Sequence, residues 1–471
     1  MNKFIKQKGA LLILVLIFGS IFFVMVSSFM NFVITQTRVQ EVKQQQEQAR
    51  EIAEAGLNYY KWYLAHNPDD VTNGTGLPGP YVMPYDDPEL GEIGEFSLSI
   101  ASSTFCGEIS AIDIYSTGRT HENPTLDRTV YGRYARPTVA EYAYIINANV
   151  WAGGDRTIIG PYHSNGVIRM DGTNNSTVSS GQENWVCDGS LSCAPTGNGS
   201  TVDGVFGDGP NNALWNFPTP PINFTGLTVD LSVMRNKAEL GGGIYIPPSG
   251  DYGYRLDFQS DNTVDVYKVD RTYNYRGYTT QNGTQYERNV IRDDDPYATY
   301  SINPSCPLIF VEDKVWLEGD IASKVTIAAA DTDTPGINPS MILNDNITYT
   351  STSSGLLAIA ENDVLVGLEV PNNMTLNGIF IAQTGRFGRN HYKSWQLPNF
   401  LTGYVTRNSL TMHGTVVSNN RVGTKWTNNG TFISGFNTRY NSYDRDLVNN
   451  PPPLAPKTSD DFKFVEWREM D

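Results

Sequence analysis

The sequence predicts a mainly β protein that begins with one long helix. An uncharged apolar run continues into an amphipathic stretch, which predicts a helix over residues 10–65. Beyond it, short runs of alternating apolar and polar residues are separated by turn residues, and only residues 231–240 again show a helical period. The remaining segments are expected to be a leader at 1–9, a small antiparallel β region at 66–140, a large head at 141–440 and a C-terminal tail at 441–471.

The composition indicates an extracellular protein. The formal charge is −16, only 18% of the residues are charged, and Gly (43) and Tyr (26) are abundant. A surface this acidic does not suit general binding to nucleic acids or anionic lipids. Segments that are polar, uncharged and rich in aromatic residues are more typical of an extracellular β protein than of a cytosolic enzyme.

The first half of the predicted helix is long enough to cross a membrane. Lys3, Lys6 and Lys8 precede an apolar run at 10–34, and the next charged residue is Arg38. The basic residues predict that the leader lies inside and the bulk of the chain outside. A removable secretory signal would have a shorter apolar region and a small-residue cleavage site, and the sequence has neither.

The second half of the helix is amphipathic. Apolar residues continue at roughly helical spacing: Val39, Val42, Ala49, Ile52, Ala53, Leu57, Tyr60 and Leu64. Asn67–Pro68 ends the helix, because the residue before a proline is disfavoured in the helical region. A helix of about 55 residues would be about 80 Å long, with its first half in lipid and its second half packed on a soluble domain.

Two stretches of this helix resemble type IV pilins. The segments "KGALLILVLI" (Lys8–Ile17) and "AEAGLNYY" resemble the N-terminal region of PilX-type minor pilins, over residues 6–65. The resemblance implies cleavage by a prepilin peptidase between Gly9 and Ala10. It also implies a subunit that leaves the inner membrane for an extracellular pilus and binds other pilins through its N-terminal helix.

Leu14 departs from that family, which carries a glutamate at the fifth residue after the cleavage point. In the family, the carboxylate pairs with the N-terminal amine of a neighbouring subunit, since an unpaired charge in hydrocarbon is costly. A subunit at the filament tip has no subunit above it, and the large pseudopilin that caps the type II secretion filament likewise lacks the glutamate. Leu14 therefore indicates a tip or priming subunit; the alternative is an uncleaved single-span anchor.

The region after the helix predicts an antiparallel meander. Its strand-like runs are Glu95–Ala101, Glu108–Arg119 and Asp127–Arg136. Residues 71–88, which are rich in Gly, Pro, Asn and Asp, are expected to form a linker. A helix followed by such a meander is the usual architecture of a pilin head.

The large head carries an irregular repeat of an apolar residue, a polar residue and then Gly or Asp. The repeat begins at Met170, Leu317, Leu343, Leu376 and Met412, with 26 to 36 residues between the last four. The glycine permits a backbone turn between two short strands. We interpret the pattern as a parallel β-solenoid, or β-helix, with loops inserted between its turns; a β-sandwich is the alternative.

Further stretches resemble large uncharacterised β-rich surface proteins of bacteria that occur beside PilX-like N-termini. These stretches are "GPYHSNGVIRMDG", "GGGIYIPPSG", "GRFGRNHY", "SLTMHGTVVSNNRVGTKW", "YNSYDRDLVNNPPPLAP" and "FKFVEWREMD". The resemblance covers most of residues 140–471. It implies no known chemistry and bears on the architecture alone.

The four cysteines predict disulfides, because their number is even and the chain carries export signals. Four cysteines allow three connectivities. Cys187 and Cys193 enclose a short loop and are the favoured pair, and the pair Cys106–Cys306 then follows by elimination. The alternative is four free, buried thiols.

No catalytic signature is present, so we expect no enzyme. The five histidines lack HxxxH or HExxH spacing, and the chain has no G-x-S-x-G or phosphate-loop motif. A hydrolase on the solenoid would need paired carboxylates, whereas the Asp and Glu residues lie mostly in turn-like contexts. Calcium is the one cofactor with candidate ligands, and Asx-type turns are the alternative. These ligands are Asp293, Asp294, Asp295, Asp331 and Asp333.

The charge distribution indicates a candidate site for anions. Residues 370–443 contain no Asp or Glu, and the aromatic residues Phe387, Tyr392, Trp395, Tyr404 and Trp426 are interleaved with seven basic ones. Six of the basic residues are the candidate ligands: Arg386, Arg389, Lys393, Arg407, Arg421 and Lys425. Such a combination holds phosphates, acidic glycans or single-stranded nucleic acid. The alternative is that this span docks on an acidic surface of the same protein or of a neighbouring pilin.

Together these features predict a non-catalytic minor subunit of a type IV pilus or related filament, at or near the tip. Its head would contact an extracellular glycan, DNA or another cell-surface ligand. One alternative is a membrane-anchored surface protein outside any filament, and another is a carbohydrate-active β-helix enzyme.

Overall fold

The computed structural model describes residues 8–67, 70–193, 197–227, 230–334, 336, 338–459 and 461–470. The chain divides into two compact units. The smaller unit comprises Met1–Ala101, Asp113–Arg133 and Glu466–Asp471, and the larger comprises Ser102–Ile112 and Tyr134–Val465. Most of the larger unit is therefore inserted in the chain between two strands of the smaller unit's sheet.

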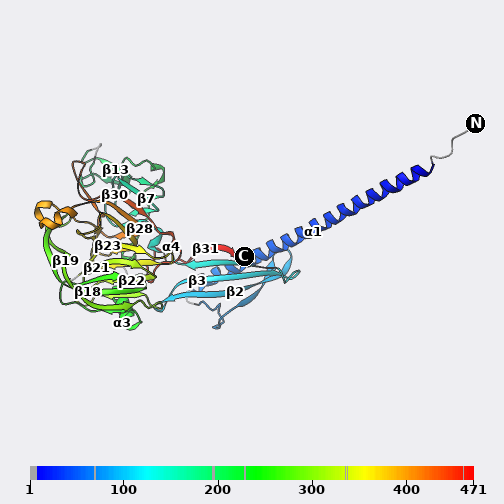
Figure 1. Ribbon diagram of the computed structural model, residues 1–471, viewed down its shortest axis with the longest axis horizontal. Coiled ribbons are helices and arrows are strands. Elements are labelled where there is room, and N and C mark those ends of the chain that lie inside the picture. Colours follow the sequence, from blue (N-terminus) through cyan, green and yellow to red (C-terminus); the bar gives the residue numbers. More distant parts are fainter. Residues whose placement is uncertain are drawn as a thin grey trace, which may run out of the picture. The chain divides into compact units, whose positions relative to one another are not determined.

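The smaller unit contains the helix α1 (Lys8–His66) and most of a five-stranded sheet (Figure 1). The strand order is β1 (Tyr81–Asp87), β2 (Gly91–Phe105), β3 (Glu108–Thr120), β4 (Asp127–Ala135) and β31 (Lys463–Met470). The long helix and the three expected strands are thus present. Two expectations are wrong: the region expected to be a linker contains β1, and the expected C-terminal tail supplies β31. The segment β1 alternates in exposure along its length, as a strand with one solvent face does, and β1 and β31 form the two edges of the sheet.

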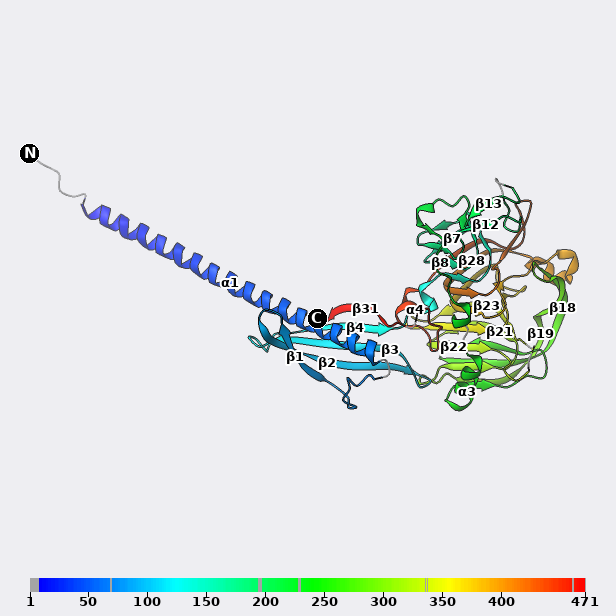
Figure 2. The ribbon, with the colours of Figure 1, turned by 180° about the vertical axis from the view of Figure 1, so that it is seen from behind.

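The larger unit is built from parallel strands in three runs (Figure 2). In spatial order, the first run is β16 (Ile244–Ile246), β20 (Leu308–Val311), β22 (Lys324–Ala329), β24 (Gly355–Ala360), β26 (Asn373–Ala382), β28 (Thr406–Ser418), β5 (Tyr144–Ile146), β8 (Tyr162–Ser164), β11 (Val178–Ser180) and β15 (Trp215–Asn216). The second run is β17 (Tyr254–Phe258), β21 (Val315–Ile321), β23 (Met341–Tyr349), β25 (Val364–Val366) and β27 (Phe387–Gly388). The third run continues from the later parts of β21 and β23 through the first parts of β26 and β28 to β30 (Thr431–Ser442), β7 (Arg156–Ile159) and β10 (Thr173–Asn174). Every pairing in these runs is parallel, which fits the expected solenoid-like head and not the alternative β-sandwich.

The winding order of the larger unit does not follow the chain. The chain begins in the interior of the first run at β5 and proceeds through β8 and β11 to β15 at one end. It then resumes at the opposite end with β16 and winds back to β28, which pairs with β5. The first and last turns of the head are therefore neighbours in the middle of the run.

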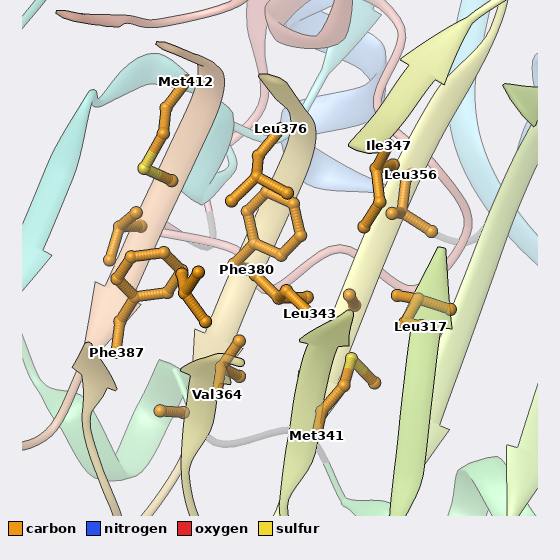
Figure 3. Packing of buried hydrophobic residues seen from close by; sticks show 14 of the residues in the cluster. Leu317, Met341, Leu343, Ile347, Leu356, Val364, Leu376, Phe380, Phe387 and Met412 are labelled. Atoms are coloured by element: carbon orange, nitrogen blue, oxygen red, sulfur yellow. The ribbon is translucent and has the colours of Figure 1, made fainter. Parts of the chain in front are cut away.

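The sequence repeat marks positions that stack on one another. Leu317 lies opposite Leu343, and Leu376 lies opposite Met412. These side chains point into one apolar core, as Figure 3 shows. The step between the two pairs is offset, because Leu376 pairs with Ile347 instead of Leu343. The two pairs that are in register are 26 and 36 residues apart in the sequence, so the irregular spacing of the repeat also reflects connecting segments of different length.

The glycines of the repeat are required by the backbone. Gly414 has a φ of 139°, which L side chains rarely adopt. A Cβ at Gly414 would lie 1.9 Å from the carbonyl oxygen of Gly378, its partner in β26. The two strands approach each other too closely at this turn for any side chain.

Insertions between the turns of the solenoid form the remaining elements. The longest is the hairpin of β18 (Thr263–Thr279) and β19 (Gly283–Ser301). The short strands are β6 (Val150–Ala152), β9 (Ile168–Met170), β12 (Asn184–Val186), β13 (Thr201–Asp203), β14 (Val205–Phe206) and β29 (Lys425–Asn428). The helices are α2 (Phe224–Leu227), α3 (Leu231–Leu240) and α4 (Arg445–Asn449), with 3₁₀ turns at Val139–Glu141, Asn212–Leu214, Ser394–Gln396 and Asn399–Tyr404. The helix α3 matches the expected helical segment at 231–240, and the carboxylate of Asp230 caps its N-terminus.

Candidate functional site

The first half of α1 presents a continuous apolar surface. Every large apolar side chain from Leu11 to Ile34 is at least 44% exposed. Within the described chain, α1 is the one helix that is long and apolar enough to cross a membrane. An apolar surface of this size requires lipid or neighbouring apolar helices around it.

The second half of α1 packs on its own sheet. Ile52 and Leu57 are at most 2% exposed. A Cβ at Gly118 in β3 would lie 2.2 Å from the carbonyl oxygen of Ala49, and a Cβ at Gly94 in β2 would lie 2.7 Å from the side chain of Ile52. The sheet thus carries glycine where the helix comes closest, so helix and strands are in direct backbone contact.

The chain leaves α1 through a hydrogen-bonded turn. The hydroxyl of Tyr60 donates to the carbonyl oxygen of Val71 over 2.8 Å, and the hydroxyl of Tyr63 donates to Asp70. Hydrogen bonds from Thr72 and then from Tyr63 lower the pKa of Asp70 to about 2. The charged carboxylate therefore holds this turn over the ordinary pH range.

The residues expected at the cleavage point lie in the first turns of α1, where the backbones of Gly9 and Ala10 are helical. The side chain of Leu14 is 55% exposed and belongs to the apolar surface. Lys3 and Lys6 lie outside the described residues.

Arg389 is not an anion ligand, contrary to the expectation from the charge distribution. Its side chain is 0% exposed. The guanidinium donates to the carbonyl oxygens of Gly367, Leu368 and Tyr404, and burial lowers the pKa of Arg389 to about 10. Arg389 therefore cross-links three backbone carbonyls inside the protein and is out of reach of an external ligand.

Arg386 is also buried, with 6% exposure, and donates to the side chain of Asn390. The charge distribution predicted that Arg386 is accessible to a ligand, because a count of charged residues contains no information on burial. Asn390 and Tyr392 in turn donate to Glu287 of β19, at 2.5 and 3.1 Å. The span without acidic residues thus contacts an acidic residue from another part of the chain.

Three more of the candidate cations are directed toward the protein itself. Arg421 donates to the carbonyl oxygen of Ser190 over 2.9 Å, and Arg407 donates to that of Gly403 over 3.2 Å. Lys425 lies 3.6 Å from Asp155. Asp155 also forms an ion pair of 2.7 Å with Arg439, which is the remaining basic residue of the span. Lys425 and Arg439 thus contact an acidic group of the same protein, whereas Arg407 and Arg421 contact backbone carbonyl oxygens.

Lys393 differs from the other five. Within the part of the chain that the structure describes, its side chain forms no hydrogen bond and no ion pair, whereas each of the other five donates at least one hydrogen bond. Its Nζ lies 5.5 Å from the ring centre of Trp395. Both residues line a hollow of about 700 Å³, which we call the aromatic hollow. Its other lining residues are Tyr278, His391, Tyr392, Ser394, Val405, Trp426, Thr427, Asn428 and Ile433.

The rings of the aromatic hollow come from two distant parts of the chain. The backbones of Tyr278 in β18 and His391 donate to each other over 2.9 Å in both directions. The ring of Trp426 in β29 stacks on His391 at 5.4 Å with an interplanar angle of 23°. Trp395 is 79% exposed at the margin. The sequence identified Trp395 and Trp426 but missed Tyr278, since nothing local indicates that the β18–β19 hairpin reaches this span.

Four of the five aspartates considered for calcium are engaged by other groups. In β19, Asp293 pairs with Arg271, and Asp294 pairs with Arg255 at 2.5 Å. Asp333 pairs with Arg235. The Asp331 carboxylate accepts the backbone N–H groups of Asp333 and Thr334, at 3.0 and 2.8 Å. These contacts of Asp331 form the Asx-type turn given as the alternative. Asp293–Asp295 lie in the strand β19 rather than in a loop of ligands.

No cation site emerges from the other carboxylates either. Among the described residues, no group of three or more His, Cys, Asp or Glu side chains is placed to hold a metal ion. A hollow of about 560 Å³ is lined by Asp257, Glu318, Asp320 and Asp345. These four carboxylates lie on strands rather than in turns. Glu318 is paired with Arg255 at 2.8 Å.

Both expected disulfides are present in the larger unit. Cys106 pairs with Cys306 across 200 residues, and Cys187 pairs with Cys193 across 6. Arg169 and Arg421 donate to backbone carbonyl oxygens within the short disulfide loop. Among the described residues no cysteine is free.

No protein-family model matches the chain, and no curated protein is similar to it. Among solved structures, the chain is similar to the competence-associated pilin ComZ from Thermus thermophilus. The identity is 14%, the match covers 90% of this chain and 97% of that chain, and the TM-score is 0.30.

Proposed function

We propose that this chain is a non-catalytic, pilin-type subunit of a type IV pilus or a related filament. The observation that supports it best is the division of α1 into two halves. The first half exposes large apolar side chains along its whole length, whereas the second half packs on the sheet of the same unit. Such a helix crosses a membrane before assembly and lies among the helices of other subunits afterwards.

The N-terminal peptide of the protein recovered from its cells, identified by mass spectrometry, tests this proposal. We expect the mature chain to begin at Ala10, with a methylated amine, because a prepilin peptidase would cut after Gly9. Gly9→Val is expected to block the cut and to leave the protein in the inner membrane. A mature chain that begins at Met1 would contradict the proposal and would support a membrane-anchored surface protein outside any filament.

We propose further that the subunit lies at or near the filament tip. The support is Leu14, which lacks the carboxylate that a shaft subunit uses to pair with the amine of its neighbour. Quantitative mass spectrometry of sheared filaments would then find this chain at a small fraction of the major subunit. The same fraction, this chain relative to the major subunit, should be measured for wild-type and Leu14→Glu chains. Equal stoichiometry of this chain and the major subunit would contradict the tip position.

The larger unit would then present its surface outside the cell and act in adhesion. A stiff stack of parallel strands with a continuous core suits a protein that projects from a surface. Cells whose chain carries Lys393→Gln and Trp395→Ala, two lining residues of the aromatic hollow, would assemble filaments but adhere poorly. Loss of filaments in such cells would indicate an assembly role instead.

A further inference from the structure

We propose that the aromatic hollow binds an acidic polysaccharide, with sugar rings lying against Trp395 and the wall formed by Trp426 and His391. A carboxylate of the sugar would pair with Lys393. This proposal concerns the larger unit alone and stands whether or not the chain enters a filament.

The wall of the hollow is held in place before any ligand arrives. The indole N–H of Trp426 donates to the carbonyl oxygen of Arg389 over 2.9 Å. Tyr278 meets the ring of Trp426 edge-on at 5.7 Å and is fixed through its backbone pairing with His391. Rings that are already ordered lose little conformational entropy on binding. They offer flat apolar faces, which match the apolar C–H face of a pyranose.

Hydrogen-bonding groups surround these rings. Ser394, Thr427 and Asn428 line the same hollow and are exposed. Their side chains have no hydrogen-bond partner within the described residues. A hydroxyl and a carboxamide both donate and accept, as do the hydroxyls at the edge of a sugar ring. An apolar ligand would leave these groups unused.

The charge of the hollow favours an anionic sugar. Lys393 contributes a positive charge, and the lining contains no carboxylate, although the whole chain carries a formal charge of −16. Single-stranded nucleic acid would also stack on aromatic rings, but it needs several cations that follow its backbone. Arg386 and Arg389 are buried nearby and unavailable. One accessible cation fits carboxylates spaced along a polysaccharide.

Isothermal titration calorimetry with the full-length protein in detergent micelles tests the proposal. The probes are oligogalacturonate, a neutral glucan oligomer of equal length and poly(dT). We expect oligogalacturonate to bind more tightly than the other two. Trp395→Ala is expected to weaken its binding by about tenfold or more, since exposed aromatic anchors dominate binding energy. Lys393→Gln is expected to weaken oligogalacturonate binding and to leave the glucan unaffected.

Trp467→Ala is the matched control, because Trp467 is 48% exposed and lies in β31, outside the hollow. Trp467→Ala is expected to bind oligogalacturonate as tightly as the wild type does. The melting temperatures of Trp395→Ala, Lys393→Gln and Trp467→Ala are all expected to be unchanged. Absence of oligogalacturonate binding would overturn the proposal, as would equal binding by Trp395→Ala. Stronger binding of poly(dT) would assign the hollow to nucleic acid, and equal binding of the neutral glucan would overturn the role of Lys393.

Discussion

The hydroxyl of Thr415 donates a 2.7 Å hydrogen bond to the carbonyl oxygen of Tyr142, which lies 273 residues earlier in the chain. This hydrogen bond lies at the seam, which is the contact between the last turn of the head (β28) and the first turn (β5). Val416 pairs with Tyr144 immediately beside it. The chain thus enters and leaves the head at adjacent turns, and the ends of the run are formed by β15 and β16 from the middle of the sequence.

We expect Thr415→Val to lower the free energy of unfolding of the larger unit by about 1 kcal/mol, because the carbonyl oxygen of Tyr142 loses its donor. Thr415 is 1% exposed, so water does not replace the lost bond. Urea unfolding followed by tryptophan fluorescence measures the difference. Thr411→Val in the same strand is the control, since Thr411 is exposed; an equal loss there would show that the seam bond has no special role.

The two disulfides should contribute unequally to stability. The bond Cys106–Cys306 closes a loop of 200 residues, and Cys187–Cys193 closes a loop of 6. On the chain-entropy scale, the long loop restricts the unfolded chain by about 5 kcal/mol and the short one by about 2 kcal/mol. Paired Cys→Ser variants under oxidising conditions check this in urea unfolding. Equal losses for the two pairs would contradict the entropic explanation.

Arg389→Met should destabilise the larger unit by about 3 kcal/mol or more, because three backbone carbonyl oxygens lose their donor and each group left unsatisfied costs about 1–3 kcal/mol. Lys393→Met is the control and should change the unfolding free energy by less than about 0.5 kcal/mol. Thermal unfolding monitored by circular dichroism distinguishes the two. If Arg389→Met instead kept its melting temperature, the internal role assigned to this guanidinium would be wrong.

Gly118→Ala should loosen α1 from its sheet. The added Cβ would lie 2.2 Å from the carbonyl oxygen of Ala49 and 2.4 Å from the backbone nitrogen of Ala53, so the helix must shift. Overpacking of this kind costs about 1–3 kcal/mol. Limited proteolysis of the protein in micelles should cut the variant faster within residues 49–66. Gly19→Ala, where nothing lies within 4 Å, should be cut like the wild type.

The larger unit should lose stability in mild acid through His163. Its Nδ1 lies 2.9 Å from Ser179 Oγ and its Nε2 lies 3.0 Å from Asn165 Oδ1, and burial lowers the pKa of His163 below its ordinary value. Below a pH of about 6.5, His163 becomes protonated in the unfolded chain but stays neutral in the folded protein. The free energy of unfolding therefore decreases as the pH is lowered from this value toward the pKa of His163 in the folded protein. His163→Gln should flatten this part of the pH profile. An unchanged slope would rule out His163 as its source, and the exposed His66→Gln provides the control.

Sequence reasoning failed where local pattern and tertiary position diverge. The cations of residues 370–443 are a real cluster in the sequence, but Arg389 is fully buried and Arg386 nearly so. The sequence alone does not distinguish a guanidinium that is exposed to water from one that donates to three backbone carbonyl oxygens. Trp395, which the sequence marked only as one of several interleaved aromatic residues, is 79% exposed.

The sequence by itself determined the elements whose signals are local. The long helix follows from continuous apolar and amphipathic spacing, the strands of the meander follow from alternation, and the strands of the head follow from the apolar repeat with its glycines at turns. Only the tertiary structure decided that β28 stacks on β5, that β31 joins the sheet of the smaller unit, and that Tyr278 faces Trp426. Parallel strands exchange the same backbone hydrogen bonds with any neighbour, so the order of stacking depends on how distant side chains pack and not on the pattern within each strand.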